Sequence, residues 1–377
     1  MTLRIFKIFF LSLLTLSFFS CSKPTNEIRI GFFGPLTGST ATWGQMGKKA
    51  VDLAVEEVNA QGGLLGKQVK VIYEDDQSLP EQAKIAALKL IKQHKVSALI
   101  GEYASSRSLA AAPEAQRNKI PMVSPFSTNP KVTAVGDYIF RVCYIDPFQG
   151  SAMAHFAYDQ LGVRSAAILR DIKNDYSIGL ANYFIETFTK LGGKIVADHA
   201  YSEGDVEFRS QLTATKASNP QAIFIPGYYT EVGLIARQTR ELGMNIPLLG
   251  GDGWDSTKTV DIGGNAANNS YFSTPFAADD PNPAGQMFIK NFQLRYALPP
   301  DGTAAVSYEA AMVLFDAIKR AGSTDGKAIR DALAATKDYD GVSGKMSLDK
   351  DRNAIKRIVI MKIEDQKLQF HSAVEPS

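Results

Sequence analysis

Short apolar runs alternate with amphipathic stretches along most of the chain. Runs with the length and β-branched content of buried strands lie at 28–33, 69–73, 98–101, 121–124, 166–169, 194–198, 222–226 and 247–250. Apolar residues recur at helical spacing in the stretches between them, at 47–60, 80–93, 148–161, 177–191 and 231–242. Because fully apolar strands that alternate with helices form parallel sheets covered on both faces, this pattern predicts an α/β fold.

The alternation is interrupted twice. Asp146-Pro147 interrupts it within 144–150, and a Pro/Ala/Asp-rich stretch breaks it again at 270–283. Helical patterns follow at 284–296, 304–320 and 326–335, and then a hairpin-like piece at 341–348 and a last strand at 355–363. These units are too many for one sheet. The pattern therefore predicts two α/β lobes joined by several crossings.

The first strand leads into a loop of small residues. The segment 28–47 places Gly34, Pro35 and Gly38 after the apolar run, followed by several hydroxyl side chains and a helix. Open sheets bind ligands in such loops at the carboxyl ends of their strands. The spacings G-x-x-x-x-G-K-[ST] and G-x-G-x-x-G are absent here, so the loop favours a small polar ligand over a nucleotide.

The amino-terminal segment predicts export. Arg4 and Lys7 precede an apolar run at 8–19, and Ser20 and Cys21 follow it. This pattern is typical of a secretory signal peptide at 1–20. The Ser-Cys pair resembles a bacterial lipoprotein processing site, which makes Cys21 the predicted lipidation site and 21–26 a tether. An uncleaved membrane anchor and an ordinary signal with an incidental cysteine are the alternatives.

Cysteine content and charge narrow the class of protein further. With Cys21 acylated, Cys143 is the one remaining thiol, so no internal disulfide forms, and its apolar surroundings predict a buried side chain. The formal net charge is +2, and Lys and Arg are scattered among Asp and Glu without a basic run. This distribution argues against nucleic acid as a partner.

Signals of catalysis or metal binding are missing. The chain has four histidines, none paired at metal-ligand spacing, and His155 on a predicted helix is expected to be a surface or packed residue and not a base. No G-x-S-x-G, H-E-x-x-H or C-x-x-C occurs. Asp75-Asp76 lacks the spacing of a calcium loop and is expected to cap a turn. We therefore predict no catalytic residue, no metal and no cofactor.

Small hydroxyl and aromatic residues do recur where predicted strands end. Ser105 and Thr128 follow two such strands, and Tyr228 and Asp252 follow two others. Hydroxyls and free N–H groups at helix starts suit a carboxylate, and a glycine-flanked Asp252 suits an ammonium group. Each residue alone also fits a cap, a packing or a turn role. Their recurrence at equivalent positions favours a binding site.

The sequence is similar to type I periplasmic solute-binding proteins of the leucine/isoleucine/valine-binding group, the receptors of branched-chain amino acid ABC importers. The matching segments are, in order, IRIGFFGPLTG, AVEEVNAQGGLLGKQVKVIYEDDQSLPEQA, VSALIGEYASS, PMVSPFSTNP, DYSIGLA, GYYTEVGLIARQTRELG and LLGGDGWDS. The resemblance implies two lobes joined by three hinge crossovers, with the ligand between them. It implies lobe 1 at 27–146 and 275–348, and lobe 2 at 147–274 and 349–377.

The resemblance also assigns roles to site residues. Ser105 and Thr128 would hold the carboxylate of an amino acid, while the Phe126 carbonyl and Asp252 would hold its ammonium. From the second lobe, Tyr176 and Tyr228 would close over the ligand. Trp43 and Tyr103 would form the wall around its side chain. The chain departs from the best-known members at Phe126 and Ser127, which replace Ala-Ala, and at Trp43, where tyrosine is common.

The resemblance implies a periplasmic or cell-surface lipoprotein, anchored to the membrane, that captures an apolar amino acid and delivers it to ABC permease subunits. Two alternatives stay open at this stage. One is a receptor for another small polar solute, such as an amide, urea or an aromatic acid. The other is a sensory module that signals on closure. An enzyme is disfavoured.

Overall fold

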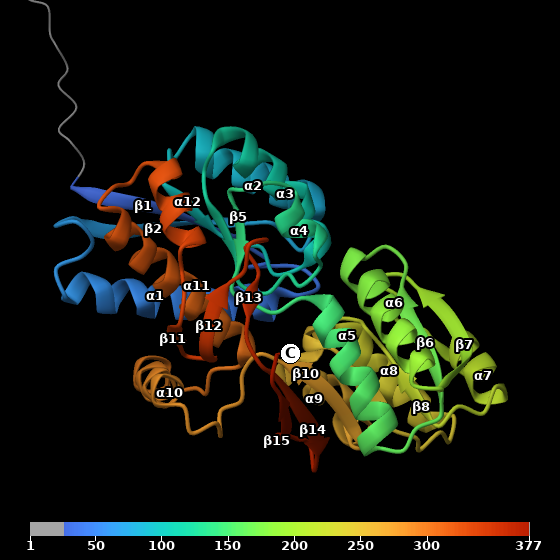
Figure 1. Ribbon diagram of the computed structural model, residues 1–377. Coiled ribbons are helices and arrows are strands. Elements are labelled where there is room, and N and C mark those ends of the chain that lie inside the picture. The colour runs from blue at the N-terminus through green and yellow to red at the C-terminus, as the bar shows by residue number, and fades with distance from the viewer. Residues whose placement is uncertain (1–25, 377) are drawn as a thin grey trace, which may run out of the picture.

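The computed structural model describes residues 26–376. The predicted signal peptide and Cys21 lie outside this range. The described chain folds into two α/β lobes lying side by side (Figure 1). The predicted fold class is confirmed.

The first lobe is built on a five-stranded parallel sheet with the strand order β2-β1-β3-β4-β5. Its strands are β1 (Glu27–Gly34), β2 (Gln68–Asp75), β3 (Ala98–Ile100), β4 (Met122–Ser124) and β5 (Ile139–Arg141). Its helices are α1 (Ala41–Ala60), α2 (Pro80–Lys92), α3 (Ser105–Asn118), α4 (Lys131–Ala134), α10 (Pro283–Tyr296), α11 (Gly302–Ala321) and α12 (Gly326–Ala334). Segments near the carboxyl terminus thus complete the amino-terminal lobe, as the orange helices beside the blue ones show (Figure 1).

The second lobe contains a seven-stranded sheet with the order β15-β14-β10-β9-β8-β6-β7. The parallel strands are β6 (Ser165–Asp171), β7 (Lys194–Tyr201), β8 (Ala222–Phe224), β9 (Leu248–Gly250) and β10 (Ser270–Thr274). β14 (Ile358–Glu364) and β15 (Lys367–Val374) add an antiparallel edge. The helices are α5 (Asp146–His155) with a π-helical end (Phe156–Gln160), α6 (Asp175–Lys190), α7 (Arg209–Ala217), α8 (Tyr229–Glu241) and α9 (Thr257–Gly263), and two 3-10 turns lie at Asp252–Trp254 and Gly264–Ala267.

The chain passes between the two large sheets three times. It crosses after β5, after β10, and between β13 (Ala354–Ile355) and β14. β13 pairs with β12 (Gly344–Leu348), which also pairs with β11 (Tyr339–Gly341), in a small separate sheet. The third crossing is therefore at residues 356–357. The lobe limits 27–146, 275–348, 147–274 and 349–377 stay a prediction.

The apolar runs predicted most strands, and the exceptions have physical causes. The segment 270–283 was expected to be a break, but its first part forms β10, a fully buried strand between β9 and β14. The apolar pattern did not predict this strand because three of its buried residues are polar: Ser270, Ser273 and Thr274. β15 escaped prediction because it is an edge strand with mostly exposed or half-buried side chains. Helix α1 begins at Ala41, six residues before the expected 47.

Two smaller expectations are confirmed. The Cys143 side chain is buried, and His155 is exposed, next to Asp159. Among residues 26–376, no helix has the length and apolar character needed to cross a membrane.

Candidate functional site

Two loops at the carboxyl edge of the first sheet carry the residues predicted to hold a carboxylate. Ser105 begins α3 directly after β3, and its hydroxyl accepts a hydrogen bond from Asn129 N at 3.2 Å. Thr128 follows β4, and its carbonyl accepts from Asp146 N at 3.0 Å. Its hydroxyl is buried without a protein partner. The parallel strand order thus brings Ser105 and the Thr128 loop together.

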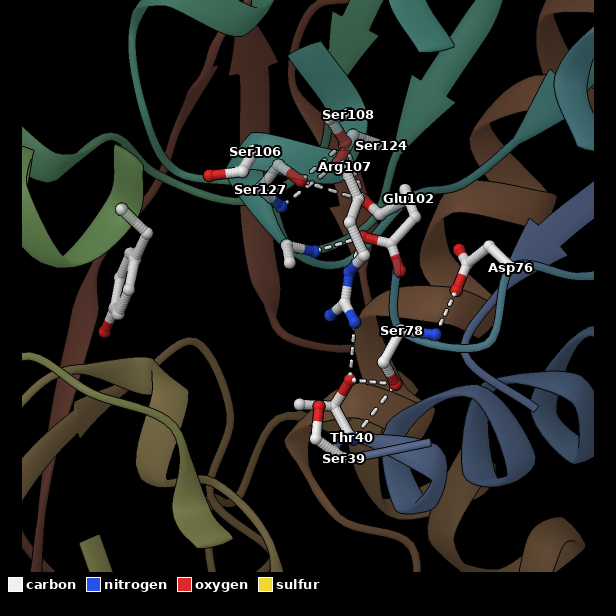
Figure 2. Close-up of polar contacts among 12 residues, drawn as sticks. Ser39, Thr40, Asp76, Ser78, Glu102, Ser106, Arg107, Ser108, Ser124 and Ser127 are labelled. Atoms are coloured by element: carbon white, nitrogen blue, oxygen red, sulfur yellow. Dashed lines mark hydrogen bonds and ion pairs between the residues drawn. The ribbon is translucent and has the colours of Figure 1, made fainter. Parts of the chain in front are cut away.

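Ser127 turns its hydroxyl into the lobe. That hydroxyl lies 2.7 Å from Ser108 Oγ and donates to the Glu102 carbonyl at 3.0 Å, which also accepts from Ser124 Oγ (Figure 2). On the other side of the loop, Arg141 donates to the carbonyls of Ser127 and Asn129. The Ser127 side chain therefore fixes the shape of the loop.

A buried group of charges lies beside these loops. The guanidinium of Arg107 lies between Glu102 and Thr40, with Nε 3.2 Å from Glu102 Oε2 and Nη1 donating to Thr40 Oγ1 at 2.9 Å (Figure 2). Burial raises the pKa of Glu102 well above its usual range, and Arg107 offsets part of this rise. Burial lowers the pKa of Arg107, but Glu102 and Asp76 reverse the shift, so the guanidinium keeps its charge. The group ties α1 to α3.

Asp76 supports the turn after β2, as the sequence predicted. Its carboxylate accepts from Ser78 N at 3.0 Å, while Asp75 accepts from Leu36 N, Thr37 N and Gln77 N. Within residues 26–376, no group of three or more His, Cys, Asp or Glu side chains is arranged to hold a metal ion.

The second lobe contributes two stacked tyrosines. Tyr176 lies in the first turn of α6, which Asn174 caps through its side chain, and Tyr228 immediately precedes α8. Their rings stack with centroids 5.5 Å apart. Tyr228 OH donates to Asn174 Oδ1 at 3.3 Å, and Tyr176 OH accepts from Gly253 N at 3.1 Å. The cap of α6 thus positions both rings.

Trp43 joins the aromatic residues of the two lobes. Its ring meets Phe126 edge-on at 5.6 Å and Tyr228 at 4.9 Å, and its indole N–H donates to the Asp255 carbonyl at 3.0 Å. Phe126 belongs to the first lobe and Tyr228 to the second. These contacts bring four of the predicted residues together: Trp43, Phe126, Tyr176 and Tyr228.

Tyr103 points elsewhere. Its hydroxyl lies 2.7 Å from Ser307 Oγ on α11, and its ring packs near Phe32 with centroids 6.3 Å apart. Both neighbours belong to the interior of the first lobe. The role of Tyr103 as a wall for the ligand side chain stays a prediction.

Asp252 is the buried acid of the site. Its side chain is 1% exposed, and neither carboxylate oxygen has a hydrogen-bond partner among the described residues. Burial raises the pKa of Asp252 to about 8 and the nearby charge of Asp146 adds to the rise, while the Tyr176 and Gln149 side chains offset part of it. A buried carboxylate with no counter-charge is costly, and an ammonium group would remove that cost.

Hydrogen bonds between the lobes surround this region. Ser106 Oγ donates to Asp175 Oδ2 at 2.9 Å and accepts from Asp175 N at 2.8 Å. Ser39 Oγ donates to Glu203 Oε1 at 2.6 Å. These contacts require the two lobes to lie close together, so the structure is in a closed arrangement.

The structure adds polar residues that the sequence reading did not assign. The sequence pattern marks Asp146 only as part of an Asp-Pro interruption and gives no signal for Gln149. Both lie on α5 and are fully buried. The signal for Asp146 was its place before a proline, where an acid at a helix start is expected. The sequence does not indicate that Arg107 is buried, because an arginine in the first turn of a serine-rich helix normally faces solvent.

A model of the periplasmic binding protein family matches residues 27–367. The chain belongs to this family. The periplasmic binding protein is 31% identical to the Leu/Ile/Val-binding protein BraC3 of Rhizobium johnstonii, with 85% of this chain and 87% of the relative covered. It is also 31% identical to Leu/Ile/Val-binding protein homolog 3 of Brucella melitensis, at 80% and 81% coverage.

Solved structures give the same result. The leucine-binding protein LivK of Thermotoga maritima superimposes with a TM-score of 0.90 at 39% identity, covering 93% of this chain and 99% of the other. LivJ of Streptococcus pneumoniae, solved with isoleucine, gives 0.89 at 33% identity, with 93% and 100% covered. A binding protein of R. palustris solved with benzoate gives 0.84 at 23% identity, which shows the shared fold.

Proposed function

We propose that this periplasmic binding protein is the receptor of an ABC importer and captures an apolar amino acid, most suitably a branched-chain one. The observation that carries the proposal is Asp252, a buried carboxylate without a hydrogen-bond partner among the described residues. The names of the relatives support it: leucine, isoleucine and valine recur in them.

In this proposal the amino acid binds through both of its charged ends. Its carboxylate meets Ser105 and Thr128, whose buried hydroxyl makes no hydrogen bond of good geometry among the described residues. Its ammonium meets Asp252 and the Phe126 carbonyl, and its side chain lies against the rings of Trp43, Phe126, Tyr176 and Tyr228. Charge-assisted hydrogen bonds at the two ends fix the orientation of the ligand, and the aromatic rings bury its apolar part.

Closure couples capture to transport. A ligand held by groups from both lobes stabilises the closed arrangement, which a permease can distinguish from the open one. No step in this cycle changes the ligand chemically, so the protein acts as a receptor without turnover. A lipid on Cys21 would keep it at the membrane beside its permease.

The decisive experiment removes the acid. We expect Asp252→Ala to weaken leucine binding by about 2–5 kcal/mol, because the buried ammonium would lose the counter-charge of Asp252. Isothermal titration calorimetry on the mature chain measures the change. Asp261→Ala is the matched control, since Asp261 pairs with Lys258 at the surface of the same lobe.

Unchanged leucine affinity in Asp252→Ala would remove the amino-acid assignment. A screen with leucine, isoleucine, valine, urea, benzoate and 4-hydroxybenzoate separates the alternatives. An acid without an amine gains nothing from Asp252, so we expect the aromatic acids to leave the melting temperature unchanged while the amino acids raise it.

A further inference from the structure

Asp146 is a second buried carboxylate beside Asp252. It begins α5 and is fully buried, and neither of its oxygens makes a hydrogen bond of good geometry among the described residues. The Thr128 side chain and Arg141 lie near enough to lower its pKa, but they offset only part of the effect of burial. A buried acid with so few polar partners is expensive to ionise. A cation that contacts both carboxylates would remove this cost for each of them.

Three observations place Asp146 close to the Thr128 loop and to the loop of Asp252. Its backbone N–H donates to the Thr128 carbonyl at 3.0 Å. One turn later on the same helix face, Gln149 Oε1 accepts from Asp252 N at 3.0 Å. Helix α6 packs against Asp146, because a Cβ built on Gly179 would lie 3.6 Å from Asp146 Oδ2. One turn earlier on α6, Tyr176 OH accepts a hydrogen bond from Gly253 N, next to Asp252. Asp146 thus lies among Thr128, α6 and the Asp252 loop.

The groups around the two acids satisfy them only in part. Gln149 Nε2 and Tyr144 OH are buried without hydrogen-bond partners of good geometry among the described residues. The Tyr176 and Gln149 side chains lower the pKa of Asp252, whereas the nearby charge of Asp146 raises it. The titratable groups that face the pair are Arg141 at the end of β5, Cys143 and Tyr144 from the first crossing, Tyr176 and Tyr183 from α6, and Asp255 after β9. The Thr128 side chain and, to a smaller extent, Arg141 favour the ionised form of Asp146.

We propose that Asp146 and Asp252 form a carboxylate pair that jointly binds the primary ammonium group of the ligand, so that capture is accompanied by proton release. This inference rests on the proposed function. A primary ammonium carries three N–H donors, which match Asp252, Asp146 and the Phe126 carbonyl. Each N-methyl group removes one donor, so the site selects primary amines.

The direction of the proton linkage follows from burial. Burial raises the pKa of Asp146 to about 7 and that of Asp252 to about 8. At pH 7 the pair therefore holds protons before the ligand binds. The ammonium favours both carboxylates, so the protons leave on binding, and leucine affinity rises as the pH increases from 6 to 8.

The test combines calorimetry with a substitution of similar shape. Leucine is titrated into the mature chain at pH 7 in phosphate and in Tris, whose different ionisation enthalpies reveal the number of protons released. We expect about one proton from the natural chain and an affinity gain of at least about tenfold between pH 6 and 8. Asp146→Asn should bind leucine at least about tenfold more weakly and release at least about 0.5 fewer protons.

Glu231→Gln is the control. Burial raises the pKa of Glu231 to about 7 as well, but its carboxylate accepts from Gly204 N. We expect unchanged affinity and proton release in this variant. The melting temperature without ligand checks folding, and Asp146→Asn should not lower it, because asparagine keeps the shape of the protonated Asp146 side chain and its capacity to form hydrogen bonds.

The outcomes separate the two proposals. If the natural chain binds no amino acid, the proposed function fails and the carboxylate pair fails with it. If leucine binds the natural chain and Asp146→Asn equally well, the carboxylate pair is wrong and the function stands. A weaker Asp146→Asn with undiminished proton release also overturns the pair, since it assigns Asp146 a structural role.

Discussion

Lys356 carries a buried charge that other residues of the protein neutralise. Its ammonium lies 2.6 Å from Glu309 Oε2, donates to the Val142 carbonyl at 3.0 Å, and also contacts Ser343 Oγ. Both charged side chains are fully buried. Val142 belongs to the first crossing and Lys356 to the third, so this single side chain ties two crossings to the first lobe.

We expect Lys356→Met to lower the free energy of unfolding by about 3–5 kcal/mol, because it leaves Glu309 buried and unpaired. Urea denaturation measures the loss. Lys190→Met provides the comparison, since Lys190 and Glu186 form an exposed pair whose removal should change stability by less than about 1 kcal/mol. Equal effects of the two substitutions would contradict the role given to Lys356.

Individual site residues differ in how far the sequence revealed them. Asp252 and Thr128 stood out because polar residues follow apolar strands, and both are buried with unpartnered oxygens among the described residues. The inward direction of Ser127 was not predictable, because it depends on Ser108 and the Glu102 carbonyl, which the fold brings to it. Asp146 escaped notice for the same reason, since its neighbours come from other elements.

At the scale of elements, the close packing of α1 against α11 depends on Gly47. A Cβ at this position would overlap Tyr103 OH and lie 2.7 Å from Ser307 Oγ. The Tyr103 hydroxyl thus occupies the space that a side chain on α1 would need. The sequence pattern began the helix at Gly47, whereas the structure extends it back to Ala41.

We expect Gly47→Ala to destabilise the protein by about 1–3 kcal/mol, although alanine favours a helix by about 1 kcal/mol over glycine. The overpacking against Tyr103 outweighs the gain in propensity. Thermal and urea unfolding of Gly47→Ala, Tyr103→Phe and the double variant test this explanation. Removal of the hydroxyl should recover part of the loss, and strictly additive effects would show that the two residues do not compete for space.

The sequence predicted well those elements whose buried face consists of apolar residues. β1 occupies Glu27–Gly34 where the pattern predicted 28–33, and α2 occupies Pro80–Lys92 where it predicted 80–93. The apolar pattern did not predict β10, because this strand contains serines and a threonine. These residues form a buried strand here because β9 and β14 supply hydrogen-bond partners to its backbone on both edges. Its position between β9 and β14 is a tertiary property.

At the scale of the whole molecule, function depends on the balance between open and closed arrangements. Hydrogen bonds such as those of Ser106 with Asp175 and of Ser39 with Glu203 exist only when the lobes meet. They lie outside the predicted ligand contacts. Each therefore contributes to affinity through closure and not through direct binding.

We expect Ser106→Ala to weaken leucine binding by about 1–2 kcal/mol, because it removes two inter-lobe hydrogen bonds worth about 0.5–1.5 kcal/mol each. Calorimetry gives the affinity, and small-angle scattering with saturating leucine reports the extent of closure. Thr189→Ala is the control, since its hydroxyl bonds only to carbonyls within α6. Full affinity in Ser106→Ala would mean that closure does not need this contact.

The sequence by itself determined the class of fold and the edge at which ligands bind. Apolar runs separated by helical patterns specify parallel sheets, and parallel strands place the residues that follow them at one edge. Tertiary structure alone decided which of those residues meet across the lobes. Trp43 and Tyr228 belong to different lobes, and their rings are in contact only because the three chain crossings hold the lobes together. It also decided the chemistry of Asp146 and Asp252, since burial by distant segments sets their charge.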